Sequence, residues 1–187
     1  MQRWLGWVLP LILFGALAAR AAEFEGVRFP TSYAAGGEAL TLSGAGLMRW
    51  KYVIKAYVAA LYLGSGAASA DVFEDVPKRL EIEYFYGFDA ADFVKVTRDR
   101  IRLNVPAAEF ELLRPRIDAL NRLYRNVSPG DRYALTYLPG IGTELSLNGS
   151  LLGTVAGSDL AKALFSIWLG SVPVDDSLKQ ALLGRER

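Results

Sequence analysis

Alternation of apolar and polar residues along the chain predicts several β-strands. In residues 79–86 every second residue is apolar, whereas Arg79, Glu81 and Glu83 are charged. A period of two is typical of a half-buried strand, because successive side chains point to opposite faces of the sheet. Further strands are predicted at residues 27–29, 38–45, 52–63, 132–138, 143–147 and 150–155.

The hydrophobic period lengthens to between three and four residues after this strand, which indicates helices. Asp89 can cap a helix that runs to about Leu103 and must end before Pro106. A second helical face follows, and Pro115 is expected to kink or restart that helix. The apolar positions of the second face are Phe110, Leu113, Ile117, Leu120, Tyr124 and Val127. The last predicted helices are one from residue 158 or 159 to 168 and a short one before Gly184.

The order of these elements indicates one α+β domain. Strands come first, two helices occupy the middle, and strands and then helices follow. Residues 64–76, rich in Ala, Ser, Gly and Asp, are predicted to form a surface loop, and Asn148-Gly149 a tight hairpin turn. No internal repeat or linker divides the chain. The pattern favours a large antiparallel sheet covered on one face by helices.

Composition narrows the possible chemistry. The 187 residues contain no Cys and no His, which excludes disulfides, a thiolate nucleophile and the commonest metal ligand. Neither a metal site nor a cofactor is predicted, so any chemistry must use Tyr, Lys, Arg, carboxylates or backbone groups. The net charge is +1 and no basic block stands out, which argues against a nucleic-acid partner.

The first 21 residues are predicted to be a cleaved signal peptide, and residues 22–187 the folded domain. Arg3 supplies a positive start, residues 5–18 are apolar, and Ala19-Arg20-Ala21 has small residues where a signal peptidase cuts. Removing Arg3 and Arg20 lowers Lys plus Arg from 21 to 19 against 20 Asp plus Glu, a net charge of −1. The alternative is a retained membrane anchor, although the apolar run is shorter than the roughly 20 residues of a spanning helix. The expected location is periplasmic or secreted, with no stable membrane span after cleavage.

Three ordered motifs carry a resemblance to a known family. The first is Gly44-Ala45-Gly46-x-x-Arg49-x-Lys51, followed by residues 54–63. The second comprises Pro129-Gly130-Asp131 with Tyr133 and then Pro139-Gly140-x-Gly142-Thr143. The third is Phe165-x-Ile167-Trp168-Leu169-Gly170 with the proline turn and helix that end at Gly184. Together they resemble bacterial chalcone isomerase-like proteins, which implies an open-faced β-sandwich with a ligand cleft between a large antiparallel sheet and a helical layer.

The resemblance also implies which residues line the cleft. In chalcone isomerases an arginine guides the phenolate, and a threonine, a tyrosine and an asparagine hold the developing enolate. Arg49 matches the region of the arginine, and the threonine position falls on Tyr57. The tyrosine and asparagine positions fall on Phe93, which has no hydroxyl, and on Arg100, which is a cation. The enolate network is therefore expected to be absent, and the arginine with a tyrosine resembles the fatty-acid-binding branch of the superfamily, where they hold a carboxylate.

The residue types agree with that interpretation. A guanidinium pairs with a carboxylate in a bidentate manner, and a tyrosine hydroxyl adds one donor. Arg49 and Tyr57 can reach one head group only if the chain turns near residues 49–51, so residues 40–45 are predicted to pair with 52–57. The candidate ligand-binding residues are Arg49, Lys51, Tyr57, Phe93 and Arg100, and no catalytic residue is assigned. The expected apolar walls are Val53, Ala59, Leu61, Tyr84 and Tyr86.

Simpler interpretations of these residues stay open. Arg49 and Lys51 can be solvated surface charges, Tyr57 a core aromatic, and Trp168 a packing anchor. Three functions follow: a non-catalytic binder of a fatty acid or similar amphipathic anion, an isomerase or intramolecular lyase on an enone-like substrate, and a structural envelope-associated protein. The binder is favoured, whereas a second hydroxyl or amide beside Tyr57 would favour the isomerase.

Overall fold

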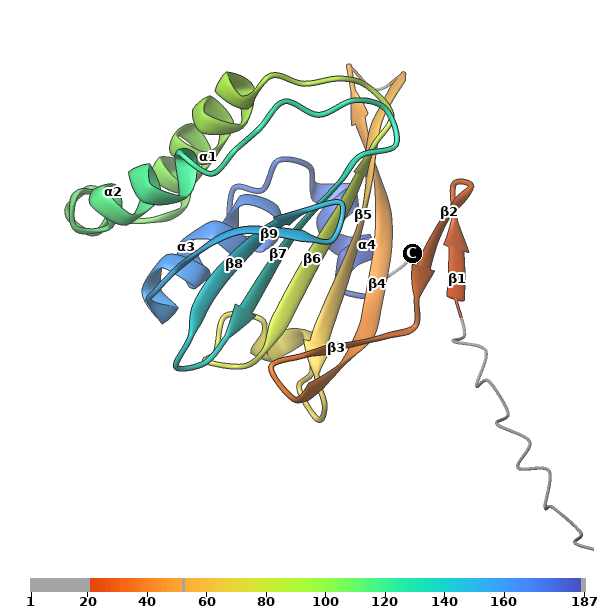
Figure 1. Cartoon of the computed structure of the whole chain (residues 1–187), viewed down its shortest axis with the longest axis horizontal. Helices are drawn as coiled ribbons and strands as arrows, with labels where there is room; N and C mark the ends of the chain where they lie inside the picture. Colours follow the sequence, from red (N-terminus) through yellow and green to blue (C-terminus); the bar gives the residue numbers. More distant parts are fainter. Residues whose placement is uncertain (1–20, 52, 186–187) are drawn as a thin grey trace, which may run out of the picture.

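The computed structural model describes residues 21–51 and 53–185. Its main element is a seven-stranded antiparallel sheet in which each strand pairs with the next along the chain (Figure 1). A separate hairpin precedes it, formed by β1 (Ala21–Phe24) and β2 (Val27–Pro30). The strands of the large sheet are β3 (Ser32–Ala35), β4 (Glu38–Trp50), β5 (Ile54–Gly64), β6 (Lys78–Tyr84), β7 (Arg132–Leu138), β8 (Gly142–Leu147) and β9 (Ser150–Val155).

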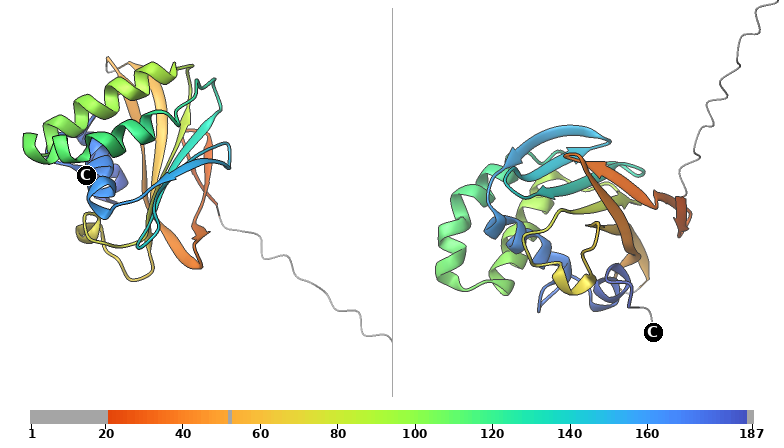
Figure 2. Two further views of the ribbon diagram at one scale, coloured as in Figure 1. Left: turned by 60° about the vertical axis from the view of Figure 1, so that its left-hand side comes forward. Right: turned by 90° about the horizontal axis from the view of Figure 1, so that it is seen from below.

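Four α-helices lie on one side of the sheet, which curls around them (Figure 2). They are α1 (Ala90–Asn104), α2 (Ala107–Asn121), α3 (Ser158–Leu169) and α4 (Asp176–Leu182). A short 3-10 helix, η1 (Ser69–Asp71), lies in the loop after β5. The predicted α+β architecture, with an antiparallel sheet covered on one face by helices, is confirmed.

The main core lies between the sheet and the helices. Alternate residues of β6, such as Leu80 and Ile82, meet the apolar faces of the helices, including Ile101 and Leu113. The last positions of the predicted second helical face, Tyr124 and Val127, are buried as expected, but α2 ends before them at Asn121. Pro115 lies inside α2, which continues through it.

The other face of the sheet is also partly covered, which the alternation of β6 did not indicate. Val27 and Phe29 of the β1–β2 hairpin form a second apolar cluster with residues of β5, including Tyr62. Arg79 and Glu81 are buried as well, at 6% and 7% exposure, instead of facing solvent, and the Arg79 guanidinium lies 4.0 Å from the ring centroid of Tyr33 in β3. Their charges are satisfied, because Arg79 Nη2 lies 2.8 Å from Glu81 Oε2. A local pattern of period two cannot reveal a distant hairpin that covers the polar side.

Two expected wall residues lie outside the core. β6 ends at Tyr84, so Tyr86 falls in the following turn and is 53% exposed. Val53 lies in the turn between β4 and β5 and is 76% exposed. Both predictions of apolar wall residues were wrong, since each assumed that a strand extends further than it does.

The first and third motifs of the sequence meet where β4 passes α4. A Cβ atom at Gly44 would lie 2.1 Å from the carbonyl oxygen of Ala181, and one at Gly46 would lie 2.8 Å from Cδ1 of Leu178. Any side chain at either position would collide with the helix. These glycines therefore allow the C-terminal helix to pack directly on the sheet.

The predicted signal peptide, apart from Ala21, lies outside the described residues. β1 begins at Ala21, at the predicted cleavage junction. Among residues 21–51 and 53–185, no helix is both long and apolar enough to cross a bilayer.

Candidate functional site

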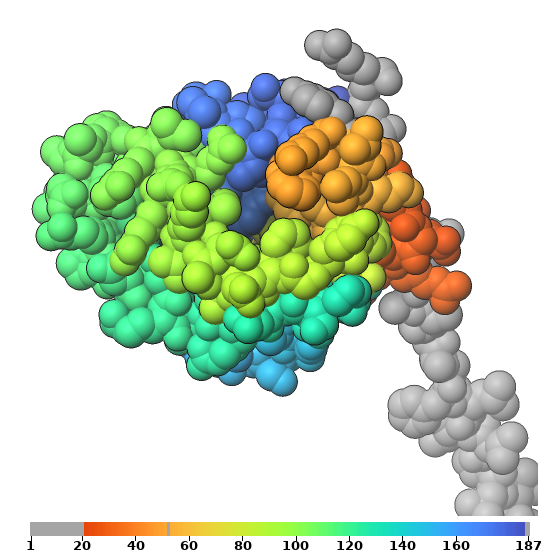
Figure 3. Space-filling view, turned by 90° about the horizontal axis from the view of Figure 1, so that it is seen from above, coloured from red at the N-terminus to blue at the C-terminus, as the bar shows by residue number. Residues whose placement is uncertain are grey.

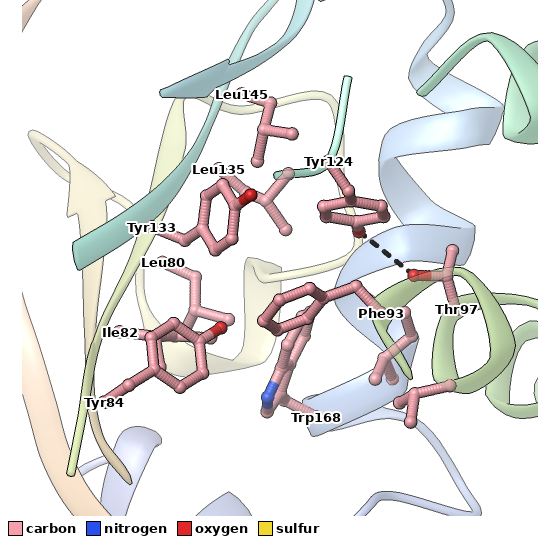
Figure 4. Close-up of a pocket in the computed structure, with 12 residues that line it drawn as sticks. Leu80, Ile82, Tyr84, Phe93, Thr97, Tyr124, Tyr133, Leu135, Leu145 and Trp168 are labelled. Atoms are coloured by element: carbon pink, nitrogen blue, oxygen red, sulfur yellow. Dashed lines mark hydrogen bonds between the residues drawn. The ribbon is translucent and has the colours of Figure 1, made fainter. Parts of the chain in front are cut away.

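A small, mostly apolar pocket lies between the sheet and helices α1 and α3. Its cavity volume is about 50 Å³, and its walls come from β6, β7, β8, α1, α3 and the segment after α2. Figure 4 shows Phe93 and Trp168 close together on one side and Tyr84 with Ile82 on the other. The cavity is narrow because aromatic side chains project into it from both layers.

Tyr84 occupies the centre of an aromatic cluster at this pocket. Its ring centroid lies 5.7 Å from that of Tyr57, 5.5 Å from that of Phe93 and 6.1 Å from that of Tyr133, and each pair meets edge to face. This arrangement is the favourable one for aromatic rings. An aromatic cluster at the pocket thus links β5, β6, β7 and α1.

The hydroxyl groups of the pocket differ in their hydrogen bonding. Tyr133 accepts from the backbone nitrogen of Arg125 at 2.6 Å and donates to its carbonyl at 2.8 Å. Tyr124 and Thr97 share a hydrogen bond of 3.0 Å, drawn in Figure 4. The hydroxyl of Tyr84 makes no hydrogen bond with any residue that the structure describes. Tyr84 thus presents a free hydroxyl to the pocket.

Tyr57 lies directly opposite Tyr84 in the pairing of β5 with β6. The indole nitrogen of Trp168 donates a hydrogen bond of 3.1 Å to the Tyr57 hydroxyl oxygen. Burial raises the pKa of Tyr57, and burial likewise raises the pKa of Tyr84 well above its ordinary value. Both hydroxyls therefore keep their protons at neutral pH and act as hydrogen-bond donors rather than bases.

Arg100 brings a positive charge to the same region. Thr97 follows Phe93 by four residues on α1 and Arg100 follows Thr97 by three, so the three residues share one face of the helix. The guanidinium of Arg100 donates to the carbonyl oxygen of Pro173 at 3.3 Å and lies close enough to Tyr57 to influence its pKa. Within the described part of the chain, no carboxylate forms an ion pair with Arg100.

A carboxylate also lies in this region, but it is already engaged. Asp175 raises the pKa of Tyr57 through its charge. Its Oδ1 atom accepts a hydrogen bond of 2.7 Å from the backbone nitrogen of Leu178, which caps α4.

Figure 3 shows that the surface is hollowed between α1, the β4–β5 hairpin and the C-terminal segment in blue.

Arg49 and Lys51 do not join Tyr57 at one point. The chain turns at Lys51, after β4 ends at Trp50, and β4 pairs with β5 so that Met48 lies opposite Tyr57. Nη2 of Arg49 lies 3.9 Å from Oε1 of Glu25, in the turn of the β1–β2 hairpin on the other face of the sheet. Lys51 has a positive φ of 51° at the tip of the β4–β5 hairpin, and its ammonium lies over the ring of Trp50.

The expected register of that hairpin was wrong. Residues 40–45 pair with residues 60–64 instead of 52–57, and a bulge between Met48 and Arg49 shifts the register. Since each single-residue shift moves a side chain to the opposite face, the sequence could not place Arg49. Of the five candidate residues, the structure brings together Tyr57, Phe93 and Arg100.

Two polar features of the site were missed by sequence reasoning. Tyr84 was expected to be only an apolar wall, and Trp168 was considered a packing anchor. The free hydroxyl of Tyr84 and the donor role of Trp168 depend on which side chains meet across the layers. Within the described residues, no group of acidic side chains is placed to hold a metal ion.

Comparison with protein-family models identifies the family of this fold and site. Residues 21–184 match the model described as "Chalcone isomerase-like", so the chain belongs to the chalcone isomerase-like family. Among solved structures, a fatty-acid-binding protein of Arabidopsis thaliana has a similar fold, with a TM-score of 0.68 and 16% sequence identity. That similarity covers 88% of this chain and 96% of the plant protein. No curated protein sequence matches significantly.

Proposed function

We propose that the protein is a non-catalytic binder of a fatty acid or a similar amphipathic anion. The head group contacts Arg100 and Tyr57, and the tail enters the aromatic pocket between the sheet and the helices. This proposal keeps the ligand class expected from the sequence. It replaces Arg49 with Arg100 as the cation, because Arg49 is placed beside Glu25.

The arrangement at Arg100 is the observation that carries the proposal. A partly buried guanidinium without a carboxylate partner among the described residues lies near a protonated tyrosine hydroxyl, at an apolar pocket. A carboxylate accepts charge-assisted hydrogen bonds from both groups, and these are stronger than bonds between neutral partners. An alkyl tail requires only apolar walls, which the pocket supplies.

The size of the cavity adds a requirement. Drug-sized ligands occupy pockets of roughly 300–1,000 Å³, whereas this cavity holds about 50 Å³. A long tail can therefore enter only if aromatic side chains move aside. Phe93 is well suited to move, because it lies on α1 and is only partly buried. Binding is expected to include the free-energy cost of opening this lining.

The structural relative supports the ligand class. The fatty-acid-binding protein of Arabidopsis thaliana has the same fold over nearly its whole length. At 16% identity the likeness concerns the fold, so the ligand is inferred from the site of this chain together with that name. A binder that needs only a cation, a donor and apolar walls can retain its function through extensive sequence change.

The test is calorimetric titration of the folded protein with hexadecanoate and, separately, with hexadecanol. We expect the acid to bind more tightly, because only the carboxylate pairs with Arg100. Mass spectrometry of small molecules that copurify from the native host should find an amphipathic anion. If neither compound binds and none copurifies, the proposal fails and the structural, envelope-associated role becomes the better explanation.

An isomerase or intramolecular lyase is the second candidate, and Tyr84 is the observation that favours it. Its free hydroxyl lies beside Tyr57, so two donors could hold the oxygen of a developing enolate. Against this, the positions expected to carry the family's tyrosine and asparagine hold Phe93 and Arg100. An absorbance assay with a 2′-hydroxychalcone tests this candidate. We expect no turnover above background, and turnover that Tyr84→Phe abolishes would favour the enzyme.

The location forms a separate part of the proposal. Residues 1–21 direct export and are removed, and the domain acts in the periplasm. This rests on the charged start, the short apolar run and the small residues at 19–21. N-terminal sequencing of the exported protein should give Ala22 as the first residue. An intact Met1 in the membrane fraction would contradict it.

A further inference from the structure

We infer that the natural ligand carries an oxygen substituent close to its acidic head group, and that this oxygen accepts a hydrogen bond from Tyr84. The ligand class becomes a hydroxy or oxo acid with an apolar tail, rather than an unsubstituted fatty acid. This inference rests on the proposed binding of an amphipathic anion. It adds a second polar contact inside the pocket.

The hydroxyl of Tyr84 is the unusual group in the pocket. The Tyr84 side chain is buried, with a residue exposure of 4%, and its hydroxyl has no hydrogen-bond partner among the described residues. The hydroxyls of Tyr124 and Tyr133 line the same pocket, and both have partners. The Tyr84 oxygen is not among the fully buried side-chain atoms that lack a partner, so it opens onto the pocket. A ligand oxygen in the pocket can accept its hydrogen bond.

The position of Tyr84 fixes where that oxygen must lie. Tyr84 and Tyr57 are directly opposed on neighbouring strands, so their side chains leave the same face of the sheet. Cβ atoms of such pairs are about 5 Å apart. A carboxylate held by Tyr57 and Arg100 therefore places the first few carbons of the chain beside Tyr84. Figure 4 shows the Tyr84 hydroxyl directed into the space shared with Ile82 and Phe93.

The chemistry of the hydroxyl selects the kind of substituent. Tyr84 keeps its proton at neutral pH, so it donates, and either a hydroxyl or a ketone oxygen can accept. A methylene group at this point would leave the donor unpaired and desolvated. Sites that contain a buried polar group discriminate against analogues that cannot pair with it. Tyr84 is thus assigned as a specificity-determining residue.

The experiment compares four acids of equal chain length by calorimetry: hexadecanoate, 3-hydroxyhexadecanoate, 3-oxohexadecanoate and 16-hydroxyhexadecanoate. The wild-type protein should bind the two 3-substituted acids about three- to tenfold more tightly than hexadecanoate, the range expected for one hydrogen bond. Tyr84→Phe should remove this preference and leave the affinity for hexadecanoate within about twofold. Tyr124→Phe is the matched control, because the Tyr124 hydroxyl already has Thr97 as a partner, and it should retain the preference.

Each outcome decides the inference. Equal affinity for all four acids, a preference for the terminal hydroxyl, or a preference that survives Tyr84→Phe would overturn it while leaving the proposed fatty-acid binding intact. Failure of every acid to bind would overturn the proposed function itself. Thermal unfolding of each variant confirms that it is folded. Ligand-free Tyr84→Phe should unfold at nearly the same temperature as wild type, because the change removes a hydroxyl that bonds to no described residue.

Discussion

The indole nitrogen of Trp168 donates a hydrogen bond to the hydroxyl oxygen of Tyr57 across a distance of 3.1 Å, although the two residues are 111 positions apart in the sequence. The bond joins α3 to β5 at the inner face of the sheet. Because Trp168 occupies an acceptor site on the Tyr57 oxygen, the hydroxyl proton of Tyr57 must point elsewhere. The Tyr57 hydroxyl proton is therefore free to donate to the head group of the proposed ligand.

Trp168 should report ligand binding by fluorescence. A Trp50→Phe variant leaves Trp168 as the only tryptophan of residues 22–187, since the others are Trp4 and Trp7. An apolar tail in the pocket removes water from the partly buried indole, so its emission should shift to shorter wavelength on titration with hexadecanoate. An unchanged spectrum at saturating ligand would place the tail outside this pocket.

Replacement of the two arginines should separate their roles. Arg100→Ala removes the cation near Tyr57 and should weaken fatty-acid binding by about 1.5–3 kcal/mol, the range for hydrogen bonds to charged groups. Arg49→Ala is the matched control and should leave affinity unchanged, because Arg49 lies beside Glu25 on the other face. Calorimetry measures both changes. A larger loss of affinity in Arg49→Ala than in Arg100→Ala would show that Arg49 contacts the head group.

The sequence predicted more of the fold than of the candidate site. Local patterns located most strands, such as the alternation of the strand that became β6, because these signals depend only on residues close in sequence. Arg49 was misplaced because its side follows from a bulge between Met48 and Arg49, which has no clear local signature. The burial of Arg79 follows from residues distant in sequence, such as Tyr33, whose ring lies over its guanidinium, and such contacts likewise leave no local pattern.

Phe93 should control the length of tail that the pocket accepts. Its ring packs against those of Tyr124 and Tyr133, at centroid distances of 5.4 Å and 5.2 Å. Phe93→Ala should lower the free energy of unfolding by about 2–4 kcal/mol, since it leaves a cavity. The same cavity should strengthen binding of hexadecanoate relative to octanoate.

Phe88→Ala is the control for this prediction. Phe88 contacts Tyr84, with ring centroids 5.6 Å apart, but does not line the pocket. Urea denaturation should show that it also destabilises the protein, whereas the ratio of the two affinities should stay at the wild-type value. A ratio unchanged in Phe93→Ala as well would mean that the tail does not pass Phe93.

The buried tyrosines should make the protein sensitive to alkaline pH. Burial raises the pKa of Tyr124 to about 12 and also raises those of Tyr57 and Tyr84, whereas an unfolded tyrosine titrates near pH 10. Above about pH 10 the unfolded chain therefore loses protons that the folded chain keeps, so the free energy of unfolding falls as pH rises. Urea midpoints measured at about pH 9, 10 and 11 should show this decline.

Two substitutions and one buried lysine sharpen the test. Tyr124→Phe should reduce the decline above about pH 10, whereas Tyr86→Phe should not, because Tyr86 is 53% exposed. Burial lowers the pKa of Lys78 to about 8. Between about pH 8 and 10 the unfolded chain keeps a proton on Lys78 that the folded chain has lost. The contribution of Lys78 to the free energy of unfolding therefore rises with pH in this range, opposite to that of the tyrosines. If the free energy of unfolding fell equally steeply in Tyr124→Phe and Tyr86→Phe, the decline could not be assigned to the buried Tyr124.

The contact between β4 and α4 should tolerate no added methyl group. In Gly46→Ala the new Cβ would lie 2.8 Å from both Cβ of Ala181 and Cδ1 of Leu178, and in Gly44→Ala it would lie 2.1 Å from the Ala181 carbonyl oxygen. Each change should cost about 1–3 kcal/mol or more of unfolding free energy through overpacking. Denaturation curves of the two variants measure the loss.

A second-site change distinguishes the two collisions. Ala181→Gly removes the Cβ that Gly46→Ala would strike, but it leaves the carbonyl oxygen that Gly44→Ala would strike. By itself Ala181→Gly should cost roughly 1 kcal/mol in helix stability. In a double-mutant cycle it should therefore offset part of the loss from Gly46→Ala and none of the loss from Gly44→Ala. Equal coupling in both cycles would show that α4 moves as a whole rather than yielding at Ala181.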